Sequence, residues 1–590
     1  MDSSKRKTVS PVMSDAKKKK LEKRRVLPQQ IELPSEMSAS SYVKEFCSKF
    51  KEPEDAIRWL LANAKMTIDE FFSNKWEKES LAMHAAEEDK QLKEIFSCGY
   101  FEKVVSASLK QKPPRKWMNG CDIYVEKYAD GKSSDLEIEV TEKELKQALT
   151  EKFSIQVCQP QRYQRALHAF MERLETYFGS LSSSNGFISP AGCQFRGPRY
   201  DNENYFVLQT EGSQIWKLYK PVVELSVEFS DDLDPAKLDK PTSVVTLKPG
   251  DVLYIPRGTI FESVAGDDAL SAYVILSVYQ NHHIGRYLAE TIPVLLDEYV
   301  KKNVGLREGL PLGFLPHTFT MTAEKYANSL LKLADCIRDA KNANSLPVPV
   351  DMLNEFMSNR LPPFTGAEQS ESDRKLTKDA KVRLTNKAHV SYYTRPMLDS
   401  DLDEHHADEE AEEVESADDE KRNKASGDNG TPGKATPKKD ASSKATPKKD
   451  ASSKATPKKD ASSKATPKKD TPKKDAAMKG AATKNTPSKG STDKAVPDKA
   501  DVDLEEKELV VLCSVYNDVA THRMTQFVPI DSEDNTLCFS TSYTVVLEKL
   551  FKAEDAVTVS QLETELGDKS LDLTVFLQAL MNIGALEVVA

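Results

Sequence analysis

The 590-residue sequence lacks the long apolar segments and the cysteine pattern that mark membrane and secreted proteins. It has no run of roughly 18 apolar residues that could cross a bilayer, and its N-terminus is polar, unlike a secretory signal peptide. The eight cysteines are scattered, and no two of them form a C-x-x-C pair. These absences argue against a membrane span, a disulfide framework and a cysteine zinc site, and they predict reduced thiols inside a cell.

Histidine is also scarce, with nine residues in the whole chain. Only His406 is followed two residues later by an aspartate, Asp408, and this pair lies in the acidic run DSDLDEHHADEEAEEVESADDE. A metal triad needs a rigid scaffold to hold its ligands, which a block of like charges does not provide. The sequence therefore contains no intact His-x-Asp motif within a region patterned for folding.

Charge, by contrast, is abundant and is arranged in blocks. The formal net charge is −10, yet the segment from Lys5 to Arg25 contains KRK and KKKKLEKRR. Such a segment cannot bury enough apolar area to fold, so residues 1–40 are predicted to form a disordered basic tail. The two clusters indicate a nuclear import signal, and a solvated tail without an address is the alternative. We therefore expect a nuclear protein, with the nucleolus as its compartment.

A second charged block spans residues 399–502, where the acidic run precedes a lysine-rich tract that repeats the decapeptide ATPKKDASSK. This composition predicts disorder. Each Thr-Pro-Lys-Lys unit suits loose contact with nucleic-acid phosphates, and it is also a site for a proline-directed kinase, whose phosphate would cancel most of the unit's charge. A soluble spacer is the alternative. The candidate phosphorylation sites are Thr436, Thr446, Thr456, Thr466 and Thr471.

The remaining segments have the periodicities of folded structure. Apolar residues recur at helical spacing in SSYVKEFCSKF, PEDAIRWLLA and MTIDEFFSNKWEKESLAMH, which predicts a helical region up to about His84. Six later segments predict the strands of an antiparallel barrel or sandwich: CDIYVEKYA, FSIQVCQP, YFVLQTEG, QIWKLYKP, SVVTLKPGDVLYIPRG and LSAYVILSVYQ. Between them, QRYQRALHAFMERLETYFG predicts an amphipathic helix. Its His168 lies beside the apolar stripe and is expected to be structural rather than a metal ligand. The stripe consists of Leu167, Phe170, Leu174 and Phe178.

Two stretches near these strands have the outline of a metal site without its histidines. In PRYDNENYF, Arg199 and Asp201 are two residues apart and are expected to alternate along a strand, so that both point to one face. In KPGDVLYIPRGTIFESV, two turns flank an apolar strand and direct residue 261 inward. This arrangement is similar to the second cupin motif, whose last position is normally a histidine, but here it is Phe261. Arginine cannot give a metal a lone pair, and phenylalanine has none to give.

Longer stretches resemble a known family. FFSNKWEKESL, GFISPAGCQ, PRYDNENYFVLQTEGSQIWKLYKP, GDVLYIPRGTIFE and LSVYQNHHIGRYL are similar to the ribosomal oxygenases, JmjC-type enzymes that hydroxylate histidines of ribosomal proteins and have also been assigned histone lysine demethylation. The similarity covers most of the chain outside the charged insert. It implies an α+β fold, with a JmjC/cupin double-stranded β-helix, flanking helices, a helical dimerisation region and a C-terminal winged helix. It also implies Fe(II) and 2-oxoglutarate as family cofactors, and a homodimer.

The resemblance assigns a degenerate site. The family's His-x-Asp pair and distant histidine fall on Arg199, Asp201 and Phe261, so only the carboxylate remains. The family lysine that pairs with 2-oxoglutarate falls on Gln214, which keeps a hydrogen-bond donor without the charge. A family asparagine near the cosubstrate falls on Asn185. We expect Arg199 to neutralise Asp201, and Phe261 to fill the space of the imidazole and metal.

The region after the barrel predicts more helices and a C-terminal domain. TAEKYANSLLKLADCIRDAKNA predicts a long amphipathic helix that contributes apolar side chains to the core or to a dimer. KVRLTNKAHVSYYT, KELVVLCSVYN, TLCFSTSY and ALEVVA predict strands, and TVVLEKLFKA and LDLTVFLQALMNIG predict helices, in the order of a winged helix. The charged insert is then a loop within this domain, because loop-closure entropy grows slowly with length. The apolar residues of the long helix are Leu330, Leu331, Leu333 and Ile337.

The predicted organisation has six parts. A basic tail (1–40) precedes the N-terminal helical part of the JmjC module (41–115) and the JmjC/cupin barrel (116–283). A helical dimerisation region (284–375) then leads to the winged helix (376–398 plus 503–590), which the charged insert (399–502) interrupts.

Two functions remain open from the sequence. The chain is either a nuclear or nucleolar binding or scaffold protein of ribosome biogenesis or chromatin, with lost or strongly impaired oxygenase activity, or an active Fe(II)- and 2-oxoglutarate-dependent oxygenase with an unusual metal site. Its partners would be ribosomal proteins or histones, with nucleic acid as a further partner of the lysine-rich insert. The replacement of two iron ligands and the cosubstrate lysine favours the binding protein, which is expected to hold neither Fe(II) nor 2-oxoglutarate.

Overall fold

The computed structural model describes residues 31, 33, 34, 37, 40–309, 323–339, 347–364, 376–396, 507–524, 536–568 and 570–589. Three groups of expectations lie outside these residues: the basic segment from Lys5 to Arg25, the five Thr-Pro-Lys-Lys threonines, and the pair His406 and Asp408. Within the described ranges, every helix is too short or too polar to span a membrane.

The N-terminal region is helical, as the sequence predicts, but only as far as residue 74. Helices α3 (Ser41–Ser48), α4 (Pro53–Leu60) and α5 (Ile68–Asn74) have side-chain N-caps or capping boxes. The prediction of helix up to about His84 is wrong, because Leu81–Met83 forms the short strand β1, which pairs antiparallel with β9 (Val252–Ile255). Pairing with a strand distant in sequence overrides the local helical pattern there. Helices α6 (Cys98–Lys110) and α7 (Glu142–Thr150) follow.

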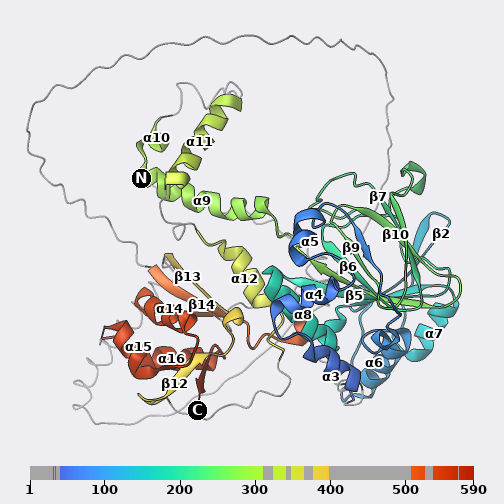
Figure 1. The fold of residues 1–590 in the computed structure, drawn as a ribbon, viewed down its shortest axis with the longest axis horizontal. Helices are drawn as coiled ribbons and strands as arrows, with labels where there is room; N and C mark the ends of the chain where they lie inside the picture. The colour runs from blue at the N-terminus through green and yellow to red at the C-terminus, as the bar shows by residue number, and fades with distance from the viewer. Residues whose placement is uncertain are drawn as a thin grey trace, which may run out of the picture. The chain divides into compact units, whose positions relative to one another are not determined.

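Two antiparallel sheets form the barrel. The larger has the order β1-β9-β6-β11-β5-β4-β2-β3, and the smaller has the order β10-β7-β8. All six predicted strand segments contain strands, although the segment from Ser243 splits into β8 and β9 at the Gly250–Asp251 turn. The barrel strands are drawn in cyan to green in Figure 1. Their bounds are β2 Ile123–Ala129, β3 Lys132–Asp135, β4 Ser154–Cys158, β5 Ser182–Ser189, β6 Asn204–Glu211, β7 Gln214–Tyr219, β8 Ser243–Leu247, β10 Ile260–Ala265 and β11 Ser271–Val278.

The central strands β6 and β11 of the larger sheet are buried on both faces. Successive side chains along each strand point to opposite sides, so each strand contributes to two cores. On β6, Phe206 and Leu208 belong to the apolar core shared with the N-terminal helices, whereas Val207 belongs to the core inside the barrel. The interior core also contains Trp216 and Phe261, so the barrel centre is packed with side chains. Helix α8 (Arg165–Phe178) packs against α3 and α4, with the predicted apolar stripe in the shared core.

In the described parts of residues 284–364, four helices follow the barrel: α9 (Ile284–Lys302), α10 (Val304–Arg307), α11 (Ala323–Asp339) and α12 (Val350–Asn359). The long helix predicted from residue 322 is therefore present as α11. Of its predicted apolar contacts, Leu333 is buried, whereas Leu330 and Leu331 are each 50% exposed.

The C-terminal elements, drawn from yellow to red in Figure 1, have an apolar core of their own, which includes Val382, Leu547 and Phe576. The prediction of one strand in KVRLTNKAHVSYYT is wrong, because a turn and a short 3₁₀ helix at Lys387–His389 divide it between two sheets. One sheet has the order β16-β12-β17, and the other has the order β13-β14-β15. The elements are β12 Lys381–Leu384, β13 Val390–Pro396, β14 Lys507–Cys513, β15 Thr536–Ser540, α14 Thr544–Lys552, β16 Val557–Thr558, α15 Val559–Leu566, α16 Leu573–Asn582 and β17 Leu586–Val589.

Candidate functional site in the barrel

The segment that carries Arg199 and Asp201 is an irregular stretch before β6. The expected strand is absent from it, since Arg199 forms only an isolated bridge with Phe261 on β10. The amide of Arg199 donates to the carbonyl of Phe261 at 3.0 Å, and the amide of Phe261 donates back to Arg199 at 2.8 Å. The carbonyl of Asp201 accepts from Gly258 at 2.9 Å. The backbone thus brings all three positions of the degenerate triad together.

The Arg199 side chain contacts the other two residues of this triad. Its Nε lies 3.8 Å from Oδ2 of Asp201, and its guanidinium carbon lies 4.9 Å from the centroid of the Phe261 ring. Both charged side chains are mostly buried, with 15% of Arg199 and 19% of Asp201 exposed. The guanidinium therefore makes an ion pair and a cation–π contact at the same time.

Phe261 fills the barrel interior. Its side chain is buried, and its ring centroid lies 5.9 Å from those of Trp216 and Tyr205. Burial raises the pKa of Tyr205 well above its ordinary value, and the neighbouring Asp201 raises it further. The aromatic side chains around Phe261 thus fill this part of the barrel, and the adjacent ion pair of Arg199 and Asp201 carries no net charge.

The two positions assigned to 2-oxoglutarate lie in different parts of the barrel. Gln214 begins β7 and is buried, and its Nε2 donates to Oγ of Ser263 at 3.0 Å. Its Oε1 has no hydrogen-bond partner in the described part of the chain. In the pairing of β7 with β10, Gln214 is opposite Ala265, four residues beyond Phe261, which is about 13 Å along the strand. Asn185 lies on β5 of the larger sheet, where its Oδ1 accepts from Nε2 of Gln156 at 3.2 Å.

A cavity of about 680 Å³ opens beside the ion pair. Its lining contains six carboxylates and two guanidiniums, and Arg196 already makes two 2.6 Å hydrogen bonds with Glu126. The sequence reasoning missed the acidic residues other than Asp201, because they come from β2, from β3 and the residues just after it, and from the β7–β8 connection; only the run SDDLD signalled two of them. The charged residues that line the cavity are Glu126, Asp135, Glu137, Arg196, Arg199, Asp201, Asp231 and Asp232.

The donor set around Asp201 does not fit an iron ion. The described residues contain no group of three His, Cys, Asp or Glu side chains arranged to hold a metal. Arg199 and Phe261 stand at two of the three positions that the family resemblance assigns to iron ligands, and neither side chain gives a metal a lone pair. His168 makes a 3.0 Å hydrogen bond through Nε2 with the carbonyl of Pro362, which agrees with its expected structural role.

The comparisons with known proteins agree with this architecture. A family model described as JmjC domain matches residues 156–283. Ribosomal oxygenase 2 of Rattus norvegicus is 32% identical over 376 residues, which cover 62% of this chain and 77% of that protein. The chain belongs to the ribosomal oxygenase family. Its α+β architecture is therefore of the JmjC/cupin type, as the sequence predicts.

Other members of the ribosomal oxygenase family differ in how much they share. Ribosomal oxygenase 2 of Bos taurus is 37% identical over 252 residues, so the match spans 42% of this chain and about half, 54%, of that protein. The ribosomal oxygenase YcfD of Escherichia coli, solved in complex with cobalt and 2-oxoglutarate, is similar with a TM-score of 0.32 and 15% identity. That match covers 54% of this chain and 80% of YcfD.

Proposed function

We propose that this ribosomal oxygenase family member has lost, or strongly reduced, iron-dependent oxygenase activity and acts as a binding or scaffold protein. The observation that carries this proposal is the position of the Arg199 guanidinium, between the Asp201 carboxylate and the Phe261 ring. An iron site with open positions for a cosubstrate needs three ligands, and here Asp201 is the only one of the three that can serve.

The contacts of Arg199 explain how the barrel holds together without a metal. A mostly buried carboxylate is costly unless a cation is nearby, and Arg199 supplies that cation. Its planar guanidinium also covers the face of Phe261, which a lysine would do less well. We accordingly assign Arg199, Asp201, Phe261, Gln214 and Asn185 to a degenerate oxygenase site, in which Fe(II) and 2-oxoglutarate are not held.

The acidic cavity supports a basic protein segment as partner. Its six carboxylates outnumber its two guanidiniums, and one of the guanidiniums already pairs with Glu126. Complementary charge accelerates association and selects partners more than it adds affinity. Ribosomal proteins are the partners that the family name suggests, and histones are the alternative partners. We place this binding in the nucleus, in the nucleolus above all, as part of ribosome biogenesis or chromatin function.

A dimer is part of this proposal. Helix α9 exposes Leu288, Val294 and Leu296 at 42–54%, and α11 exposes Leu330 and Leu331 at 50%. Large apolar side chains exposed together on two neighbouring helices support a helix-to-helix interface between two copies of the chain. The helical region 284–375 is thus proposed as the dimerisation region.

We also propose that residues 376–398 and 503–590 form a winged helix. Helices α14, α15 and α16 share one apolar core with strands β12, β16 and β17, the element order that such a domain has. A fold alone does not establish nucleic-acid binding, so this domain supplies a scaffold surface in the proposal.

An active oxygenase with an unusual metal site is the second candidate, because its relatives are named oxygenases. Purified full-length protein would be loaded with Fe(II) under anaerobic conditions, and 2-oxoglutarate turnover would then be measured with ribosomal peptides in air. We expect no retained stoichiometric iron and the same background turnover as the variant Asp201→Ala. Turnover clearly above that control would establish the active enzyme instead.

A further inference from the structure

Helix α8 has a second stripe, away from its apolar one, that is polar and whose carboxylates are buried. His168, Glu172 and Glu175 follow at spacings of four and three residues and therefore lie on one face of the helix. Glu172 is 1% exposed and Glu175 is fully buried. Buried carboxylates need cations or several hydrogen-bond donors, so this face requires partners from elsewhere in the chain.

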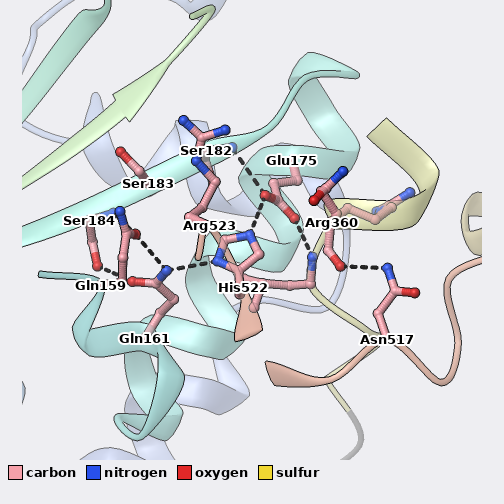
Figure 2. A network of polar contacts seen from close by, with 12 residues as sticks. Gln159, Gln161, Glu175, Ser182, Ser183, Ser184, Arg360, Asn517, His522 and Arg523 are labelled. Carbon is pink, nitrogen blue, oxygen red and sulfur yellow. Dashed lines mark hydrogen bonds and ion pairs between the residues drawn. The ribbon is translucent and has the colours of Figure 1, made fainter. Parts of the chain in front are cut away.

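Glu175 has partners in three separate segments, two of them far away in the sequence. Its Oε1 accepts from Nε2 of His522 at 2.9 Å and from the amide of Ser182 at 3.0 Å, and its Oε2 accepts from the amide of Leu361 at 2.8 Å. Nδ1 of His522 lies 2.7 Å from Nε2 of Gln161, an amide nitrogen that can only donate. Figure 2 shows Glu175, His522 and Gln161 in one line of contacts.

A second pair lies one helical turn away. Oε1 of Glu172 accepts from Nε2 of His389 at 2.8 Å, and Nδ1 of His389 lies 2.8 Å from Oγ of Ser514. Burial lowers the pKa of His389, and the hydrogen bond with Glu172 offsets only part of that effect. Burial alone would raise the pKa of Glu172, but His389 and the adjacent Arg173 outweigh it and hold that pKa below its ordinary value.

Arg360 completes the charge balance of this interface. Its guanidinium is buried and donates to the carbonyl of Ala388 and to Oγ1 of Thr176, both at 2.5 Å. Its backbone carbonyl accepts from Nδ2 of Asn517 at 2.9 Å. The two carboxylates of Glu172 and Glu175 are balanced in charge by the two guanidiniums of Arg173 and Arg360. A charge-neutral buried network avoids the main cost of enclosing ions.

The residue after His522 extends the network to the candidate site. The guanidinium of Arg523 lies 3.8 Å from Oε1 of Glu203 and also donates to Oε1 of Gln280. Glu203 is two residues after Asp201, in the irregular segment that carries the degenerate triad, and its side chain is 12% exposed. One short turn, residues 519–524, thus contacts both α8 and the segment that holds Arg199 and Asp201.

We propose that the two Glu–His pairs form a lock between α8 and the C-terminal elements, and that Arg523 couples this lock to the segment 198–204 of the candidate site. A partner that binds the C-terminal elements and withdraws the turn 519–524 then loosens the barrel site, and a partner in the cavity stabilises the closed lock. Such linkage between two binding regions is reciprocal. The lock is independent of whether the site retains catalytic activity.

Hydrogen exchange in the full-length protein tests the lock with two variants and a control. His522→Leu removes both imidazole nitrogens, and Arg523→Gln removes the guanidinium that reaches Glu203 and Gln280. The control His84→Gln breaks another His–carboxylate pair, in which Nδ1 of His84 lies 2.9 Å from Oδ2 of Asp251. The His84 imidazole is exposed and lies outside the lock. The reporters are the amides of Ser182 and Leu361, which bond to Glu175, and that of Arg199, which bonds to Phe261.

His522→Leu should accelerate exchange at all three reporter amides by about tenfold or more, because local opening sets their exchange rate. Arg523→Gln should accelerate only the Arg199 amide, and His84→Gln should change none of them. The lock is refuted if Ser182 and Leu361 keep wild-type exchange in His522→Leu. The coupling is refuted if Arg199 keeps wild-type exchange while the other two accelerate.

A conservative variant covers the case in which His522→Leu does not fold. His522→Gln keeps an amide donor toward Glu175. It should retain slow exchange at Ser182 and Leu361 at pH 7. If the folded His522→Gln protein exchanges these two amides faster than Arg523→Gln does, the hydrogen bond from residue 522 to Glu175 is not what holds the lock.

Discussion

Arg199 and Phe261 are hydrogen-bonded to each other in both directions through their backbones, and the guanidinium of one lies 4.9 Å from the ring centroid of the other. Family resemblance places iron-binding histidines at these two positions. The replacements therefore contact each other directly, and Arg199 also pairs with Asp201. These contacts should contribute to the free energy of unfolding of the barrel, and a series of substitutions can measure that contribution.

Replacing Arg199 should destabilise the barrel through two separable effects. Arg199→Ala removes the charge beside Asp201 and the cover over Phe261, and it should cost about 1–4 kcal/mol in the free energy of unfolding. Arg199→Met keeps the packing but not the charge, so its loss should be smaller. The double variant Arg199→Met with Asp201→Asn should recover most of that loss, because no buried charge remains. Chemical denaturation of the four proteins measures these differences, and equal stability of Arg199→Ala and wild type would contradict the counter-charge role.

Much of the barrel could be predicted from the sequence because its strands are short apolar runs between turn residues. The sequence also indicated that Arg199, Asp201 and Phe261 would lie close together, since they occur in motifs with fixed spacing, and the structure brings them into contact. The nature of Leu81–Met83 could not be predicted, because only its pairing with β9 makes this segment a strand. The local apolar pattern favoured a helix there, but pairing with β9, more than 160 residues away in the sequence, makes the segment a strand.

The burial of the polar stripe of α8 could not be predicted from the sequence either. Glu172 and Glu175 lie away from the apolar stripe, where an amphipathic helix normally faces water. Their partners His389 and His522 are 217 and 347 residues further along the chain. No local periodicity encodes contacts at that separation. The position of a single histidine in the sequence likewise does not indicate which carboxylate it will contact in the fold.

The lysine-rich insert predicts a test of nucleic-acid binding. If the Thr-Pro-Lys-Lys units contact phosphates, deletion of residues 435–474 should weaken binding to all sequences alike and should flatten its dependence on salt. Binding of the full-length and deleted proteins to unrelated duplexes, measured between low and physiological salt, provides the comparison. The same affinity and the same salt slope in both proteins would leave the repeat as a spacer.

Mild acid should destabilise the protein through the buried histidines of the α8 interface. Burial lowers the pKa of His168 to about 4, and it also lowers the pKa of His389. Both groups thus take up protons more readily when unfolded, where their pKa is about 6.5. Their contribution to stability is complete above that value and is lost as the pH falls toward the folded value. For His168 the loss at pH 5 is on the order of 2 kcal/mol.

The pH effect can be assigned to His168 by substitution. His168→Gln keeps an amide donor for the carbonyl of Pro362 but cannot be protonated in this range. The free energy of unfolding of this variant should fall less steeply between pH 7 and pH 5 than that of wild type. The variant His84→Gln, in which the replaced imidazole is 55% exposed, should follow the wild-type curve. A His168→Gln curve parallel to wild type would contradict this origin of the acid sensitivity.

Restoring the missing ligands should restore metal binding. In the triple variant Arg199→His, Phe261→His and Gln214→Lys, the two imidazoles join Asp201 as a three-ligand set, and the lysine supplies a cation for the far carboxylate of 2-oxoglutarate. The backbone already holds residues 199 and 261 in a reciprocal pair, so the new imidazoles start close together. A ligand that binds only the folded state raises the melting temperature by mass action. Anaerobic thermal melts with and without Fe(II) and 2-oxoglutarate should therefore shift upward for the triple variant and stay unchanged for wild type.

Adding Asp201→Ala to the triple variant should abolish the shift, which separates binding at this site from binding to surface carboxylates. Catalysis need not return with the metal, because the groups that orient the ligands also tune the reaction. A wild-type melt that Fe(II) raises as much as the triple variant would mean that Arg199 and Phe261 do not mark a dismantled iron site, and the active oxygenase would then be the better account.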